Sequence, residues 1–228
     1  TPKGSKPFLD ERPGQGKITA KLTGGGVKMN IIILPEGNFQ PDNSLPFLVK
    51  AFEKEGFLVK WFLWDNPPSF KDDLLRASGH LKLGEPSILL AIGRGGYLAF
   101  NLLKGLQNFT AVIICCAPYD LRKWPQLSKL SNEWKAYFKS NPAELAPFTN
   151  LPPTLLLYGK DDKVVGWEQG MLAYMGLSTT FQPGLPKPSV RLIGVSRGAH
   201  NLAYEQETIE SIIFWLSKLL PRQKGGMK

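Results

Sequence analysis

The chain has 228 residues, of which 43% are hydrophobic, and a formal net charge of +9. This length is enough to bury one large core, so we expect one folded domain. No run of about 18 apolar residues occurs, so we expect no membrane-spanning helix.

The two ends of the chain carry most of its positive charge. Residues 1–28 are rich in Gly, Pro and Lys and hold six Lys/Arg against two acids, while residues 218–228 hold four Lys/Arg and no acid. The body between them is nearly neutral, with 18 basic and 17 acidic side chains. We therefore predict basic tails at 1–28, with a short hairpin near 18–22, and at 221–228. Such tails either solubilise the protein or contact RNA, anionic lipid or an acidic neighbour.

Apolar segments of strand length alternate with amphipathic segments of helix length from residue 29 to residue 220. Strands are predicted at 29–34, 57–64, 87–92, 111–116, 154–158 and 190–195, and helices at 44–55, 71–83, 97–106, 167–174 and 202–220. The stretch 118–150, with Trp124 and Trp134, is irregular. Strands that alternate with helices require right-handed crossovers and a mostly parallel sheet. We predict a doubly wound α/β domain with helices on both faces and ligands at the carboxyl ends of its strands.

Three strand ends in this pattern are followed by residues of chemical interest. The third strand enters the glycine-rich turn Gly93-Arg94-Gly95-Gly96 and leaves directly as a helix. The fifth strand is followed by Asp161 and Asp162, and the sixth by a loop that contains His200. Parallel strands place these ends at one edge of the sheet, so we expect the three junctions to lie near one another.

In this order the junctions resemble those of the α/β-hydrolase superfamily, over about residues 29–220. In that family a nucleophile turn, an acid and a histidine follow one another in this order along the chain. The segment from Gly159 to Val165 is similar to the family's acid turn, with the acid at Asp162, and His200 matches its histidine. The resemblance implies an α/β-hydrolase-like sheet with a short cap or none, and the triad-equivalent positions Gly95, Asp162 and His200.

The chain departs from the family at the nucleophile. The family pattern is Gly-x-Ser-x-Gly, whereas this chain has Gly93-Arg94-Gly95-Gly96-Tyr97, with Gly95 at the expected serine position. Glycine has no oxygen or sulfur that could attack an acyl carbon. The resemblance therefore predicts that the turn survives, that no catalytic residue is functional and that the chain is not an active hydrolase.

The loop after the first strand shows a second departure. Where the family usually has His-Gly, this chain has Glu36 and Gly37, and a carboxylate there opposes the negative charge that develops in acyl transfer. We also consider an ion pair between Glu36 and Arg94 that closes the pocket mouth. The pocket is expected to include Glu36, Gly37, Arg94, Gly96 and Tyr119.

Several other residues have alternative interpretations. His200 is either a structural remnant bonded to Asp162 or a general base that activates water. Ser196 satisfies Gly-x-Ser-x-Gly by letter, but only one helix follows it, so we interpret it as a loop residue. Asp161 and Asp162 lack further ligands at metal-binding spacing, so no metal is expected. His80 is expected at the surface of a helix.

The two cysteines are adjacent in a predicted strand and therefore point to opposite faces, which disfavours a disulfide between them. Neither Cys115 nor Cys116 has a positive partner nearby in the sequence, so we expect buried structural thiols and not a replacement nucleophile. This pattern favours a reduced, intracellular compartment, and an organellar, mitochondrial one in particular.

These features together predict a hydrolase-like protein that is catalytically inactive and serves as a structural or accessory subunit of a larger assembly. No cofactor is expected. Two alternatives stay open: a residual esterase that uses an Asp162–His200 dyad without a serine, and a small-molecule receptor that keeps the pocket without turnover.

Overall fold

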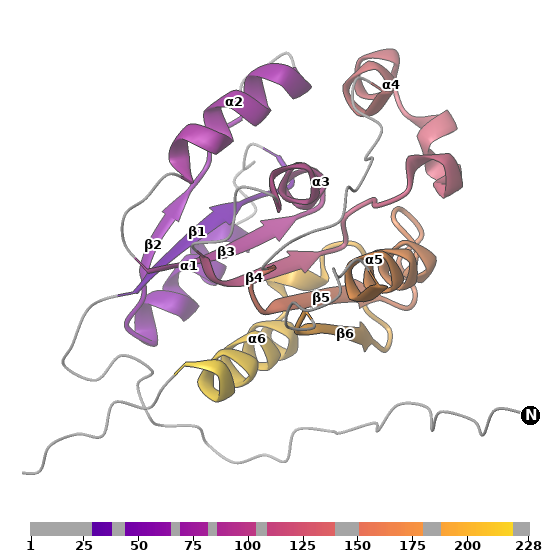
Figure 1. Cartoon of the computed structure of the whole chain (residues 1–228). Coiled ribbons are helices and arrows are strands. Elements are labelled where there is room, and N and C mark those ends of the chain that lie inside the picture. The colour runs from indigo at the N-terminus through magenta and orange to yellow at the C-terminus, as the bar shows by residue number, and fades with distance from the viewer. Residues whose placement is uncertain are drawn as a thin grey trace, which may run out of the picture.

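One sheet of six parallel strands runs through the part of the chain that the structure describes (Figure 1). The structure is a computed structural model and describes residues 29–37, 44–64, 69–81, 86–103, 109–139, 151–179 and 188–220. The predicted tails and the hairpin near 18–22 lie outside these residues. The strands are β1 (Asn30–Leu34), β2 (Leu58–Trp61), β3 (Ser87–Ile92), β4 (Phe109–Cys115), β5 (Thr154–Gly159) and β6 (Val190–Val195), in the spatial order β2-β1-β3-β4-β5-β6.

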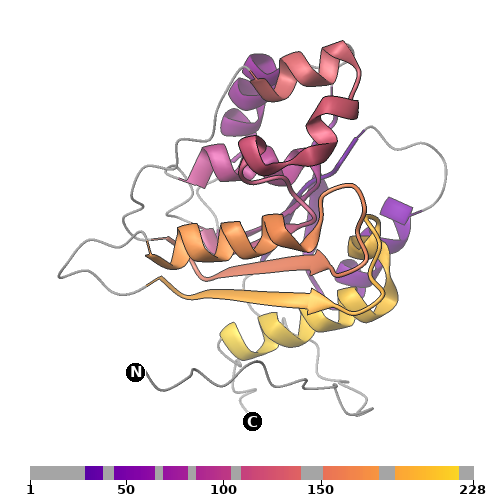
Figure 2. The same ribbon diagram turned by 90° about the vertical axis from the view of Figure 1, so that its right-hand side faces the viewer.

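Helices cover both faces of this sheet, as Figures 1 and 2 show. They are α1 (Ser44–Lys54), α2 (Phe70–His80), α3 (Arg94–Leu102), α4 (Asn132–Lys139), α5 (Trp167–Thr179) and α6 (Gln206–Leu219). Helices α1 and α6 pack on one face, and α2, α3 and α5 on the other. The parallel sheet with helices on both faces confirms the predicted α/β class.

Among the described residues, no helix combines the length and the apolar character needed to cross a membrane.

Alternate residues of each central strand belong to the two faces. On β1, Ile31 and Ile33 join the core under α1 and α6, while Ile32 and Leu34 join the core under the other helices. A strand covered by helices on both sides must be apolar at every position, which explains the continuous hydrophobic runs that predicted buried strands.

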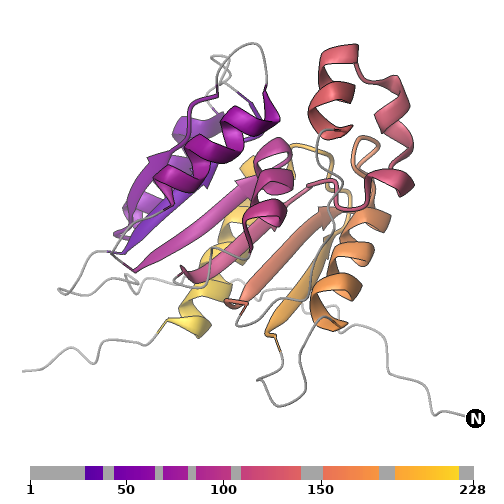
Figure 3. The ribbon, with the colours of Figure 1, turned by 45° about the horizontal axis from the view of Figure 1, so that its top comes forward.

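The irregular stretch becomes a small cap at the carboxyl ends of the strands. Its described part consists of the short 3-10 helices η2 (Leu121–Lys123) and η3 (Pro125–Lys129) followed by α4, and we call residues 121–139 the cap segment. Figure 3 shows this segment standing beyond the arrowheads of the strands. The indole of Trp124 donates to the carbonyl of Val164 at 2.7 Å, and the Tyr97 hydroxyl donates to the carbonyl of Phe138 at 3.2 Å. These bonds fix the cap segment to the loop after β5 and to α3.

Candidate active site

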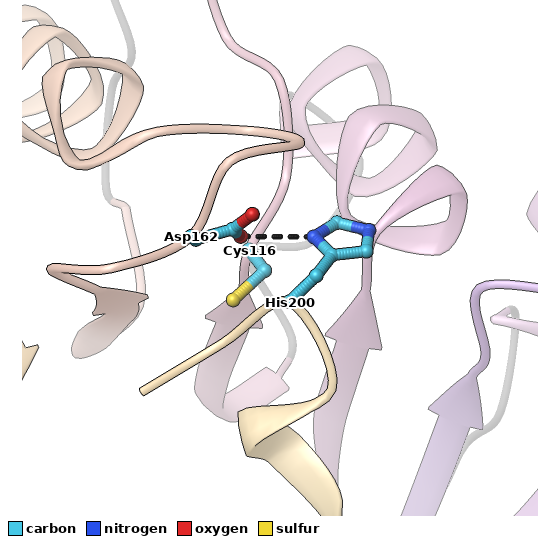
Figure 4. Close-up of side chains that lie close together, drawn as sticks. All are labelled: Cys116, Asp162 and His200. Atoms are coloured by element: carbon cyan, nitrogen blue, oxygen red, sulfur yellow. Dashed lines mark hydrogen bonds and ion pairs between the residues drawn. The ribbon is translucent and has the colours of Figure 1, made fainter. Parts of the chain in front are cut away.

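Three loops at the carboxyl edge of the sheet bring Glu36, Asp162 and His200 into one hydrogen-bonded row. They follow β1, β5 and β6; β5 and β6 are adjacent in the sheet, whereas β1 is separated from them by β3 and β4. Nδ1 of His200 lies 2.9 Å from Oδ2 of Asp162 (Figure 4), and Nε2 lies 2.6 Å from Oε1 of Glu36. The imidazole therefore bridges two carboxylates, one at each nitrogen.

Asp162 is the fixed end of this row. Its side chain is buried, and its second oxygen, Oδ1, accepts from the backbone N–H groups of Val164 at 2.7 Å and Val165 at 3.1 Å. Burial by itself raises the pKa of the Asp162 carboxyl, but the bond to His200 and these N–H groups outweigh it and lower the pKa below its usual value. Asp161 is exposed. The structure therefore pairs His200 with Asp162, the acid that the turn pattern indicated.

His200 is held in its protonated form. Burial lowers the pKa of its imidazole, but the hydrogen bonds to Asp162, Cys116 and Glu36 outweigh burial and raise the pKa to about 12. At neutral pH both ring nitrogens consequently carry hydrogen and donate to the carboxylates. An imidazolium can donate a proton but cannot accept one, so His200 is not a general base in this state.

Glu36 is the open end of the row. Its side chain is 42% exposed, against 19% for His200, so solvent reaches the carboxylate. The considered ion pair between Glu36 and Arg94 is wrong. The Arg94 guanidinium instead forms a buried ion pair with Asp73 of α2, and Glu36 pairs with His200.

The turn between β3 and α3 has its apex at Gly93. This residue has φ +52° and ψ −115°, a left-handed backbone that favours glycine, and α3 begins at the next residue. A Cβ added at Gly93 would lie 2.8 Å from Cγ of Glu36. The carboxylate side chain of Glu36 therefore fills the space into which a side chain at the apex would project.

The placement of the nucleophile-equivalent position at Gly95 is corrected by this geometry. Gly95 lies within the first turn of α3, and a Cβ there would lie only 2.1 Å from the carbonyl oxygen of Leu34. Glycine at 95 lets the helix approach the end of β1 closely. The prediction missed the apex by two positions because the run of glycines offered several alignments with the family pattern.

Three further residues expected in the pocket lie elsewhere. Gly96 packs against the sheet, since a Cβ there would lie 2.4 Å from Cβ of Ala117. The ring of Tyr119 packs on Phe100, with 5.0 Å between centroids, and its hydroxyl approaches Gly176 of α5. Arg94 is buried with Asp73. Of the expected pocket residues, Glu36 contacts His200.

Cys116 lies next to the row but on its inner side. Its backbone has φ +46°, which is rare for a residue other than glycine, and its side chain is fully buried. One ligand atom each from Cys116, Asp162 and His200 lie within 4.8 Å of one another, as a metal site requires. However, both Asp162 oxygens already accept hydrogen bonds, and burial raises the pKa of the Cys116 thiol, so this donor set does not favour a metal. Both cysteines are free, as expected.

The remaining candidates are at the surface. Ser196 is exposed in the turn after β6, and His80 is exposed at the end of α2. Sequence reasoning missed the contact between Glu36 and His200 and the partner of Arg94. No local signal in the sequence pointed to the first contact, because β1 and β6 are not adjacent strands of the sheet.

Comparison with known proteins identifies the fold. No protein-family model and no curated protein matches the sequence. Among solved structures, the esterase domain of a Rhodothermus marinus protein has 16% identity and a TM-score of 0.62, with 89% of each chain covered. Mouse alpha/beta hydrolase domain-containing protein 10 has 16% identity and a TM-score of 0.60, with 83% of this chain and 88% of that chain covered. Esterase 2 of Thermogutta terrifontis has 17% identity and a TM-score of 0.62, with 84% and 83% covered. The chain therefore has an α/β-hydrolase-like fold; identities this low show the fold and not the activity.

Proposed function

We propose that the protein performs no serine-type acyl transfer and acts as a structural or accessory subunit of a larger assembly. One observation carries the first part: the apex of the turn is Gly93, which offers no attacking atom, and Glu36 occupies the space beside it. The nitrogen of His200 that would accept a serine proton is already bonded to Glu36 at 2.6 Å. The absence of an attacking atom at the apex and the bond that occupies His200 both support the absence of serine-type acyl transfer.

Surface features support the subunit role. On and beside the edge strand β2, Leu58, Trp61 and Leu63 are exposed by 41%, 45% and 61%. Apolar side chains next to an unpaired strand edge are typical of surfaces that bind other chains. The basic tails add charge suited to an acidic neighbour, RNA or anionic lipid. A reduced, organellar compartment is part of this proposal and is compatible with the free cysteines.

The decisive test measures hydrolysis of short activated esters by the intact protein and by Gly93→Ser and His200→Ala. We expect no turnover above background in the intact protein. Turnover that disappears in His200→Ala would overturn the proposal. The subunit role is tested separately by gentle extraction from the source: we expect migration in a large complex, and a clean monomer would contradict it.

A residual hydrolase is the second candidate, because the Asp162–His200 bond of 2.9 Å that such an enzyme needs is intact. It would require Glu36 to release His200, so that the imidazole could lose its proton and activate water. Glu36→Ala makes this testable: the second candidate predicts ester hydrolysis that increases in this variant and disappears when His200→Ala is added.

A further inference from the structure

The outer edge of strand β2 has no partner strand among the described residues. β2 is the last strand on its side of the sheet (Figure 1). The N–H groups of Leu58 and Phe62 donate to backbone carbonyls on the side of β1, at 3.0 Å and 2.9 Å. Because successive residues of a strand point their backbone groups to opposite sides, the N–H and C=O groups of Val59 and Trp61 face outward. This edge can therefore accept a further strand.

Several side chains along this edge are apolar and reach solvent. Leu58, Trp61 and Leu63 are exposed, and Leu75 of the neighbouring helix α2 is 71% exposed. An unpaired strand edge flanked by exposed apolar side chains is a surface to which other chains add strands. Burial of these side chains would stabilise a strand bound there.

A pocket lies beside the carboxyl end of β2. It has a volume of about 320 Å³ and is lined, among the described residues, by Arg76, Gly79 and His80 of α2, and we call it the edge pocket. Arg76 donates to the carbonyl of Leu63 at 2.8 Å, and its guanidinium carbon lies 4.9 Å from the ring centroid of Phe62. The ring centroid of His80 lies 5.5 Å from the same centroid. The edge pocket therefore adjoins the two residues that directly follow β2.

The side chains of the edge pocket suit a carboxylate. Arg76 is a permanent cation, and an imidazole such as that of His80 donates a hydrogen bond in either of its protonation states. A Cβ added to Gly79 would meet no atom within 4 Å, so the helix surface between them is open. Lys60, exposed on β2, adds positive charge at the same edge. Such charges select a partner of opposite charge.

We propose that an extended segment of a partner protein adds to β2 as a further strand and places a glutamate or aspartate side chain in the edge pocket. Val59 belongs to the core under α1 and α6, whereas Phe62 belongs to the core under α2 and α3. Alternate side chains of an added strand would likewise lie on these two faces. Those on the α2 face reach the edge pocket, and the others contact Trp61. The partner segment therefore alternates apolar with polar residues and includes an acidic one.

The charges at this edge favour a different chain over a second copy of this one. Pairing of two β2 edges about a twofold axis would bring Lys60 and Arg76 of both copies to one interface. Like charges that face each other across paired strands are destabilising. A segment that carries a carboxylate instead offsets the positive charge.

This inference rests on the subunit role proposed above, because it states the chemistry of one partner. The two can fail separately. Migration in a large complex without peptide binding would leave the subunit role and remove this surface. Peptide binding by a chain that is extracted as a clean monomer would do the reverse.

A fluorescein-labelled peptide, Ser-Val-Thr-Val-Glu-Val-Thr-Val-Ser, and its analogue with Gln in place of Glu test the proposal on the full chain. Fluorescence anisotropy should show that the acidic peptide binds at least about 10-fold more tightly than the analogue, as expected for a hydrogen bond to a charged group. Arg76→Gln should reduce this preference to about twofold or less, and His80→Ala should also lower it. The matched control Lys71→Gln removes an exposed cation from the first turn of α2 and should leave the preference unchanged. Thermal unfolding verifies that the variants are folded.

Hydrogen exchange followed by NMR on the intact chain tests the strand addition without any variant. The amides of Val59 and Trp61 face the outer edge, so the acidic peptide should slow their exchange at least about 10-fold. The amide of Phe62 is already bonded on the side of β1, so its exchange should stay unchanged.

Three results would overturn the proposal. The first is no binding of the acidic peptide, and the second is a preference for it that Arg76→Gln leaves intact. The third is slow exchange at Val59 and Trp61 before the peptide is added, because another segment of this chain or a second copy would then cover the edge.

Discussion

The molecule contains two ionic clusters near the carboxyl edge of the sheet, and they differ in how they meet solvent. In the pair of Asp73 and Arg94, the side chains are 1% and 6% exposed. In the row of Glu36, His200 and Asp162, exposure rises from 1% at Asp162 to 42% at Glu36. The first cluster is closed on all sides and the second is open at one end. A closed ion pair can only hold elements together, whereas an open row can react with a ligand.

Aromatic rings close the first cluster. The guanidinium carbon of Arg94 lies 4.1 Å from the ring centroid of Trp64, 5.0 Å from that of Trp134 and 4.7 Å from that of Tyr137. Two of these rings come from α4, so the cation binds the cap segment to α2 and α3 by cation–π contacts as well as by charge. Arg94 directly follows the apex of the turn, yet its side chain is committed to packing.

The largest effect is therefore expected from the closed pair. Asp73→Ala should lower the free energy of unfolding by about 3–5 kcal/mol, because it leaves the Arg94 charge buried without a partner. Urea denaturation measures the change. The matched control is Arg122→Ala, which removes the exposed cation of the Asp120–Arg122 pair and should leave the free energy of unfolding nearly unchanged. Equal losses in the two variants would contradict the distinction between buried and exposed ion pairs.

The next largest loss of stability is expected at Gly95, and it should exceed the loss at Gly93. Gly95→Ala should destabilise the fold by about 1–3 kcal/mol, because its methyl group would meet the backbone of Leu34 at 2.1 Å, and backbone cannot move aside. Gly93→Ala should cost about 1 kcal/mol for its left-handed backbone, since the atoms it meets belong to the flexible Glu36 side chain. Thermal unfolding of both variants measures the order. A larger loss at 93 would show that Glu36 cannot shift.

The contrast between Gly93 and Gly95 also shows which parts of the fold and the site can be predicted from the sequence. Hydrophobic periodicity predicted all six strands and the helices on both faces, because a sheet buried on both sides needs apolar residues at every position. It also predicted the neighbourhood of Asp162 and His200, because both follow adjacent parallel strands. It could not predict the apex of the turn, which depends on the backbone angles of Gly93 among three similar residues.

Side-chain partners across long sequence separations were the other limit. Glu36 and His200 are 164 positions apart, and nothing in either local sequence selects one cation over another. From the sequence, Arg94 was an equally good partner for Glu36 as His200, because only the charges of the side chains were known and not their positions. The aromatic residues that attract Arg94 come from α4 and from the segment after β2, and their convergence depends on the path of the cap segment.

The third effect is a pH dependence of stability. The pKa of His200 is raised from 6.5 to about 12 on folding, so its contribution is complete below about pH 6.5 and falls steadily as the pH rises toward 12. Asp162 has a lowered pKa, so its contribution is lost only as the pH falls below about 3.8. His200→Ala should lower the free energy of unfolding at neutral pH, but less than Asp73→Ala does, because Asp162 keeps two backbone donors. The difference between the intact protein and this variant should be larger at about pH 6 than at about pH 9 in urea denaturation. A difference that grows with pH would show that His200 is neutral in the folded protein.

The smallest effect on stability is expected at Glu36, the exposed end of the row. It tests most directly whether this row differs from the buried pair of Asp73 and Arg94. Glu36→Gln keeps a hydrogen-bonding side chain of the same shape and removes only a charge that solvent reaches, so the free energy of unfolding should change by less than about 0.5 kcal/mol. The pKa of His200 should nevertheless fall, because one of its two carboxylate partners has become neutral. NMR titration of the imidazole measures that fall, with Asp161→Asn as the control that leaves it unchanged. Because a pKa change on folding is itself a change in stability, the fall in pKa should be modest, and a modest fall with little loss of stability would show that Glu36 tunes the protonation of His200 without supporting the fold. A loss of several kcal/mol would instead make this row a structural cluster like the buried pair of Asp73 and Arg94.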